Sequence, residues 1–106
     1  MSAYKNILIT KKGETCHISL NRPKKLNALS STTLKEISNA CEEIALNKKI
    51  KIVVISSTSE NFSAGADLTE ISKTKTIEDY WHENSGKNCI NSILNLPQIS
   101  ICLIEG

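Results

Sequence analysis

The chain has 106 residues, 40% of them hydrophobic and 23% charged, which predicts one small folded domain and argues against wholesale disorder. Its 13 basic and 11 acidic residues give a formal net charge of +2, and only 4% of its residues are aromatic. Nucleic-acid-binding proteins carry stronger and more clustered basic charge, so no nucleic-acid partner is expected. The sequence contains no apolar run approaching the ~20 residues of a membrane helix and no segment of signal-peptide type, so we expect a cytoplasmic protein without a membrane partner.

The four cysteines are not spaced as metal ligands or as a redox pair. They stand at positions 16, 41, 89 and 102, and no two of them form a C-x-x-C motif. Each falls within an apolar pattern. The sequence therefore predicts reduced thiols in the core and no metal site.

The beginning of the chain predicts a β-hairpin. Residues 4–10 are rich in isoleucine, and residues 15–20 alternate between apolar and polar side chains, as in a half-buried strand. Between them, Lys11, Lys12 and Gly13 can form a tight turn. Pro23 then marks residues 21–25 as a loop.

A helix and a parallel strand are expected next. Ser30 or Ser31 can cap a helix that runs to about Asn47. Residues 51–56 are β-branched without alternation, which is typical of a strand covered on both faces, and the strand–helix–strand order predicts a βαβ unit. The apolar stripe of the helix consists of Leu34, Ile37, Cys41 and Ile44.

The second half of the chain predicts a further helix and strand. Residues 57–63 are a polar loop, a helical turn is expected from about Asp67, and a long helix is expected over residues 76–96, before Pro97. Residues 99–104 form another apolar run, which we interpret as a buried strand. Because parallel core strands are covered on both faces, an additional covering element is expected beyond this strand.

Residues 62–68 are the most unusual segment. They are small, and they follow the carboxyl end of a predicted parallel strand, where ligands of open α/β sheets bind. Free amides at the start of a helix near Asp67 could hold an oxyanion. Taken alone, however, the segment favours a plain loop with Asp67 as a helix cap.

A second motif changes this interpretation. L-N-R-P-x-x-x-N-A-L at residues 20–29 and F-x-A-G-A-D-L at residues 62–68 together resemble the enoyl-CoA hydratase/isomerase (crotonase) family. Residues 97–106 are similar to the family segment that leads to its second oxyanion loop. The resemblance implies an α/β fold, namely the N-terminal part of a crotonase-like ββα spiral in which a hairpin is followed by βαβ units.

The resemblance also implies a site for an acyl-CoA thioester, which is the substrate, so no cofactor is expected. The backbone amide of Ala66 would be half of the oxyanion hole, and the backbone of Ala64 would contact the adenine. A lysine pair can attract the phosphates of CoA, although isolated lysines on a solvated loop would need no such role. The expected substrate-binding residues are Lys24, Lys25, Leu26, Ala64, Gly65, Asp67 and Leu68.

Family members are more than twice this long, and their second oxyanion amide and proton-moving acids lie beyond the segment matched here. The chain is therefore interpreted as the N-terminal portion of one crotonase-like domain, residues 1–106, and is expected to be inactive alone. The family forms trimers or paired trimers through C-terminal elements. No such assembly is predicted for this chain.

Alternatives remain within and outside the family. Hydration of a 2-enoyl-CoA is the leading activity, whereas isomerisation and thioester hydrolysis share the same oxyanion device and are not separated by these residues. A different class of hypothesis is a non-enzymatic truncated remnant, or a small interaction module that binds a partner through uncovered apolar surface. A third is a small α/β module unrelated to CoA.

Overall fold

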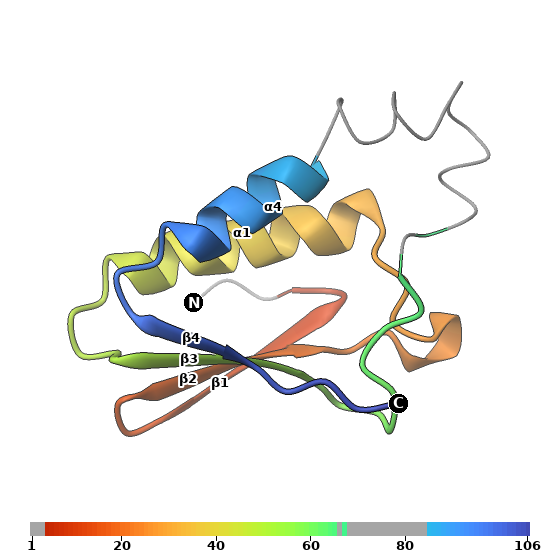
Figure 1. Cartoon of the computed structure of the whole chain (residues 1–106), viewed down its shortest axis with the longest axis horizontal. Coiled ribbons are helices and arrows are strands. Elements are labelled where there is room, and N and C mark those ends of the chain that lie inside the picture. The colour runs from red at the N-terminus through yellow and green to blue at the C-terminus, as the bar shows by residue number, and fades with distance from the viewer. Residues whose placement is uncertain (1–3, 66, 68–84) are drawn as a thin grey trace.

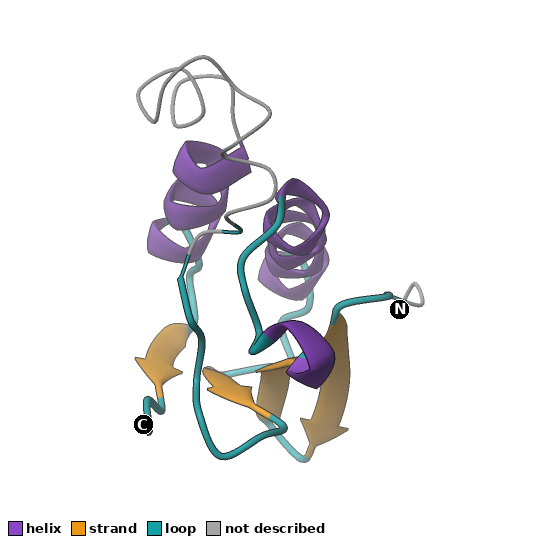
Figure 2. Cartoon of the chain, turned by 90° about the vertical axis from the view of Figure 1, so that its right-hand side faces the viewer, coloured by secondary structure: helices purple, strands orange, loops and turns teal. Residues whose placement is uncertain are grey.

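The computed structural model describes residues 4–65, 67 and 85–106 (Figure 1). In this part of the chain, four strands form one sheet, and the two α-helices lie on one of its faces (Figures 1 and 2). The fold is mixed α/β, as predicted. The elements in chain order are β1 (Ile7–Lys12), β2 (Thr15–Leu20), the 3₁₀ turn η1 (Pro23–Lys25), α1 (Ser31–Ala45), β3 (Ile52–Ser57), α4 (Ser85–Leu94) and β4 (Ile99–Cys102).

The predicted hairpin is confirmed, but its turn lies later than expected. β1 and β2 pair antiparallel, with Lys12 opposite Thr15, so the turn consists of Gly13 and Glu14. Gly13 has φ +60°, a left-handed conformation that glycine adopts without steric cost. Because a two-residue hairpin turn requires positive φ, the turn forms at Gly13, and Lys11 and Lys12 belong to β1.

The predicted βαβ unit is also confirmed. β2 pairs parallel with β3, α1 connects them, and β3 pairs parallel with β4, in the sheet order β1-β2-β3-β4. Ser30 caps α1, since its Oγ accepts a hydrogen bond from the N–H of Thr33 at 3.2 Å. The predicted stripe of α1 is buried against the sheet and comprises Leu34, Ile37, Cys41 and Ile44.

The core lies between the helices and the sheet. The alternation of β2 places every second side chain in the core, and β3 and α1 add aliphatic residues to it. Cys89 of α4 joins this core, in agreement with its predicted burial. The buried side chains of β2 and β3 in this cluster are Cys16, Ile18, Leu20, Val53 and Ile55.

The prediction of a buried final strand is wrong. β4 lies at the edge of the sheet, and no described strand pairs with its outer side. Ile99 is 66% exposed and Ile101 43%. α4 packs chiefly on α1, which leaves β4 uncovered in the described part of the chain. For the same reason Cys102 is exposed and is not the core thiol that its apolar neighbours predicted.

The end of α1 is tied to the start of β4. The Nε2 of Gln98 donates to the carbonyl of Ile44 at 2.7 Å, so it satisfies a carbonyl in the last turn of the helix. α4 ends at Leu94, before Pro97, as predicted. The earlier part of the predicted helix over residues 76–96, and the helical turn expected from Asp67, lie outside the described residues.

Candidate functional site

Two loops meet at one edge of the sheet. The first loop (residues 22–29) follows β2, and the second loop (residues 57–65) begins at the last residue of β3. Because β2, β3 and β4 are parallel, their carboxyl ends lie at the same edge, where ligands of α/β sheets bind. The segment after β4 reaches this edge too, since the N–H of Phe62 donates to the carbonyl of Glu105 at 2.9 Å.

The first loop contains two consecutive residues in the left-handed conformation. Leu26 has φ 53° and Asn27 has φ 54°, which is uncommon for residues other than glycine and especially for leucine. The N–H of Leu26 donates to the carbonyl of Pro23 at 3.1 Å, and that of Asn27 donates to the carbonyl of Arg22 at 2.9 Å. These bonds reverse the chain tightly and leave the Leu26 side chain 64% exposed.

The side chain of Asn27 fastens the two loops together. It is only 2% exposed. Its Oδ1 accepts from the N–H of Arg22 at 2.6 Å, within the first loop. Its Nδ2 donates toward the Oγ of Ser57 at 2.7 Å, the Oγ of Ser59 at 3.1 Å and the carbonyl of Phe62 at 3.1 Å, all in the second loop. The carbonyl of Asn61 lies at 3.5 Å as a fourth acceptor, and the two N–H donors of the amide are shared among the four.

Backbone hydrogen bonds join the first loop to the second loop at two further points and to Asp67 at a third. The N–H of Ala64 donates to the carbonyl of Leu26 at 3.0 Å. The N–H of Leu29 donates to the carbonyl of Gly65 at 2.7 Å, and the carbonyl of Leu29 accepts from the N–H of Asp67 at 3.3 Å. The residues on either side of position 66 are therefore both bound to the backbone of Leu29.

Ser63 adds a hydroxyl to this contact. Its Oγ donates to the carbonyl of Asn27 at 2.7 Å and accepts from the N–H of Gly65 at 3.0 Å. Gly65 has φ +94°, a conformation that favours glycine over residues with a Cβ. Ser63 therefore holds the glycine of the A-G-A-D motif against the first loop.

An ion pair closes the end of the site. Nη1 of Arg22 lies 2.8 Å from Oδ2 of Asp67, and the same Nη1 donates to the carbonyl of Ala28 at 3.1 Å. The two side chains of the pair are 24% and 10% exposed, respectively. The pair links the start of the first loop to the residue that follows the A-G-A segment.

A hollow of about 270 Å³ adjoins the second loop. Its lining is mostly polar and combines residues of β2, β3, the second loop and the segment after β4. The second loop therefore forms one wall of a recess at this edge. The lining residues are His17, Ser56, Ser57, Ser59, Glu60, Phe62, Leu103 and Glu105.

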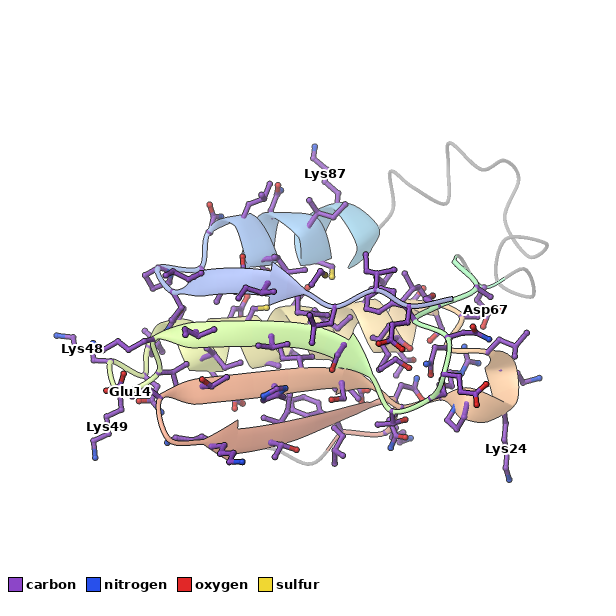
Figure 3. All side chains as sticks on the ribbon, turned by 60° about the horizontal axis from the view of Figure 1, so that its bottom comes forward. Glu14, Lys24, Lys48, Lys49, Asp67 and Lys87 are labelled. Carbon is purple, nitrogen blue, oxygen red and sulfur yellow. The ribbon has the colours of Figure 1, made fainter. Side chains whose placement is uncertain are left out.

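The structure brings most of the predicted site residues together. Lys24, Lys25 and Leu26 are exposed on and just after η1, and Figure 3 shows Lys24 extending away from Asp67. Ala64 is exposed on the second loop, Gly65 is half-buried, and Asp67 is buried. The predicted oxyanion residue Ala66 and the predicted binding residue Leu68 lie outside the described residues.

The buried thiols lie in the core and not at this edge. Burial raises the pKa of Cys41 to about 12 and that of Cys89 to about 11, so both are protonated near neutral pH. Across the described ranges there is no cluster of His, Cys, Asp or Glu that could hold a metal ion. None of the helices in those ranges is long and apolar enough to cross a membrane.

Sequence reasoning missed three residues that organise the site: Arg22, Asn27 and Ser63. Arg22 and Asn27 belong to the N-R-P-x-x-x-N-A-L motif, which was the available signal. Their partners, however, lie far along the chain: Arg22 and Asp67 are 45 positions apart, and Asn27 and Ser57 are 30 positions apart.

Comparisons with known proteins agree on one family. The family model for enoyl-CoA hydratase/isomerase matches residues 10–106. The chain is 43% identical over 103 residues to YngF of Bacillus subtilis, which is named as an enoyl-CoA hydratase/isomerase, covering 95% of this chain and 40% of YngF. It is 39% identical over 74 residues to a short-chain-enoyl-CoA hydratase of Clostridium acetobutylicum, covering 69% of this chain and 28% of that protein.

A solved structure shows the same fold. An enoyl-CoA hydratase/isomerase from Xanthobacter autotrophicus superposes with a TM-score of 0.87 at 25% identity, covering 98% of this chain and 40% of that one. The chain thus spans well under half the length of the relatives it matches. A family model that matches nearly the whole chain, relatives that share its sequence and a neighbour that shares its fold lead to one conclusion: the chain belongs to the enoyl-CoA hydratase/isomerase family.

Proposed function

We propose that the chain provides the acyl-CoA-binding part of an enoyl-CoA hydratase/isomerase-type protein, with the Ala66 amide donating to the thioester oxygen. One observation carries the proposal. Gly65 and Asp67, the two residues next to Ala66 in the sequence, are both hydrogen-bonded to the backbone of Leu29. The chain spans 40% of YngF, so the enzymatic activity of a full-length protein containing it is also proposed here.

The chemistry requires a fixed backbone donor. A preorganised N–H stabilises negative charge on the thioester oxygen as that charge develops in the transition state. Gly65 and Asp67, which stand before and after Ala66 in the sequence, are both bound to the backbone of Leu29, and in this proposal the amide of Ala66 between them is the donor to the thioester oxygen. The small residues of this segment let a thioester approach the backbone closely.

The first loop supplies the contacts for the CoA moiety. The exposed ammonium groups of Lys24 and Lys25 attract its phosphates, and the exposed Leu26 offers an apolar surface beside them. The N–H of Ala64 is donated to Leu26, so contact with the adenine would use the carbonyl of Ala64.

Hydration of a 2-enoyl-CoA is the leading reaction, and isomerisation or thioester hydrolysis would use the same oxyanion donor. One backbone donor without a proton carrier stabilises a transition state only weakly. We therefore expect the 106-residue chain to bind the thioester without turning it over. CoA enters as part of the substrate, and no further cofactor is invoked.

Calorimetric titration with crotonyl-CoA tests this function. At low salt, the double variant Lys24→Ala/Lys25→Ala should bind on the order of tenfold more weakly than the wild type, because two cations near the phosphates are lost. The matched control is Lys48→Ala/Lys49→Ala, an exposed lysine pair at the opposite end of the molecule in Figure 3, which should bind as the wild type does.

Two results would contradict the proposal. Equal losses in both double variants would show only a general charge effect. A wild-type chain that does not bind crotonyl-CoA would favour the alternative of a non-enzymatic module.

A further inference from the structure

The hydrogen bonds of Asn27 divide between the two loops according to atom type. The acceptor Oδ1 is bound to the N–H of Arg22 in the first loop. The donor Nδ2 is directed at Ser57, Ser59 and Phe62 in the second loop. The amide therefore touches both loops with different atoms, and each set of bonds can be removed separately.

Burial makes these bonds interdependent. Asn27 is 2% exposed, so a donor or acceptor that loses its partner there is not readily compensated by water. If the second loop moves away, Nδ2 is left unsatisfied, and if the first loop shifts, Asn27 withdraws its donors from Ser57, Ser59 and Phe62. The ordered states of the two loops therefore favour each other.

We propose that Asn27 is a positioning residue that couples the loops, so that the nucleotide part of CoA, bound at the first loop, orders the second loop. This inference rests on the proposed function, because it assumes that the first loop binds CoA. It adds to that function a coupling that runs from the nucleotide part of CoA to the second loop. Binding energy from a part of the ligand remote from the thioester would be used to fix the loop that faces the reacting carbonyl.

The variant Asn27→Asp separates the two sets of bonds. Aspartate keeps an oxygen that can accept from Arg22 and tolerates the left-handed backbone, but it lacks the N–H donors directed at the second loop. The readout is amide hydrogen exchange, followed by NMR at Ala64 and Gly65, whose N–H groups are bound to Leu26 and Ser63. Exchange is measured without ligand and with unacylated CoA.

In the wild type, CoA should slow exchange at Ala64 and Gly65. In Asn27→Asp these two amides should exchange on the order of tenfold faster without ligand, the effect of about one lost hydrogen bond. CoA should still bind the variant but should no longer slow exchange at these positions. A merely structural role would not remove this response to CoA.

Two references separate this effect from general destabilisation. The N–H of Lys51 is bound to the carbonyl of Glu14 in the hairpin turn, away from both loops, so its exchange should not change in Asn27→Asp. Asn39→Asp, at an exposed position of α1, is the matched control and should behave as the wild type. If Asn27→Asp does not fold, Ser63→Ala removes one hydroxyl link to Asn27 and should give a smaller effect at Ala64, which is then the only readout because Gly65 loses its own hydrogen-bond acceptor in this variant.

The coupling is overturned if CoA slows exchange at Ala64 and Gly65 equally in Asn27→Asp and the wild type. It is also overturned if CoA binds the wild type and leaves both amides unchanged. Absence of CoA binding by the wild type overturns the proposed function and the nucleotide-driven part of this inference. Unchanged exchange in the ligand-free variant would separately refute the role of Asn27 in holding the second loop.

Discussion

The ion pair between Arg22 and Asp67 is expected to contribute more to stability than a surface pair. Its N–O distance is 2.8 Å, and its side chains are 24% and 10% exposed. Unit charges about 4 Å apart attract by roughly 4 kcal/mol at an effective dielectric constant of about 20, before the cost of removing them from water. Exposed pairs retain less than about 1 kcal/mol. The partial burial here places the expected coupling energy at about 1–2 kcal/mol.

A double-mutant cycle measures this coupling. The variants are Arg22→Met, Asp67→Asn and the combination, with the free energy of unfolding obtained from urea titrations followed by far-UV circular dichroism at pH 7. Arg22→Met also loses the hydrogen bond to the carbonyl of Ala28. That loss occurs in both variants that carry Arg22→Met, so it cancels from the coupling energy.

The reasoning fails if the two single losses add to within about 0.3 kcal/mol of the double loss, since that is the behaviour of independent sites. Asp67 would then be held at the first loop by its backbone bond to Leu29 and not by charge. High salt should weaken the coupling only in part, because screening acts less on partly buried pairs.

Three further outcomes are expected. Gly13→Ala should lower the free energy of unfolding by about 1–2 kcal/mol in a denaturant titration, because φ +60° strains a residue with a Cβ even though no atom lies within 4 Å of the added Cβ; unchanged stability would contradict the turn geometry. The exposed Cys102 should react with a maleimide before the three buried cysteines, as peptide mass mapping would measure. If Cys102 reacted no faster than the other three, β4 would be covered. Burial raises the pKa of Cys41 from 9.0 to about 12, so the unfolded chain loses this proton first and stability falls from pH 9 upward. The stability advantage of the wild type over Cys41→Ala should therefore shrink by about 1.4 kcal/mol between pH 8 and pH 10, and a constant difference would refute the shift.

The sequence predicted the elements whose patterns are local. The alternation of Cys16, Ile18 and Leu20 identified β2, and the capping serine and apolar stripe identified α1. β3 followed from its β-branched run. In each case the residues that decide the structure lie within a few positions of one another.

The missed features depend on residues far apart. The apolar run at residues 99–102 resembles that of β3, but a run does not show whether its strand is central or at an edge, and Ile99 proved to be exposed. The motifs located the site, but they gave no indication that the Asn27 side chain joins its two loops. Its partners lie 30 to 35 residues away, and only the fold brings them near.

The consecutive left-handed residues of the first loop determine which substitutions it can accept. At φ 53° glycine at position 26 would be unstrained, an unbranched residue such as the present leucine is strained, and a β-branched residue would be strained most. The side chain of Leu26 is 64% exposed, so its length can change without repacking of the core. Position 26 is therefore open to evolutionary drift and to engineering of ligand preference, while the neighbouring Asn27 is constrained by the partners it holds.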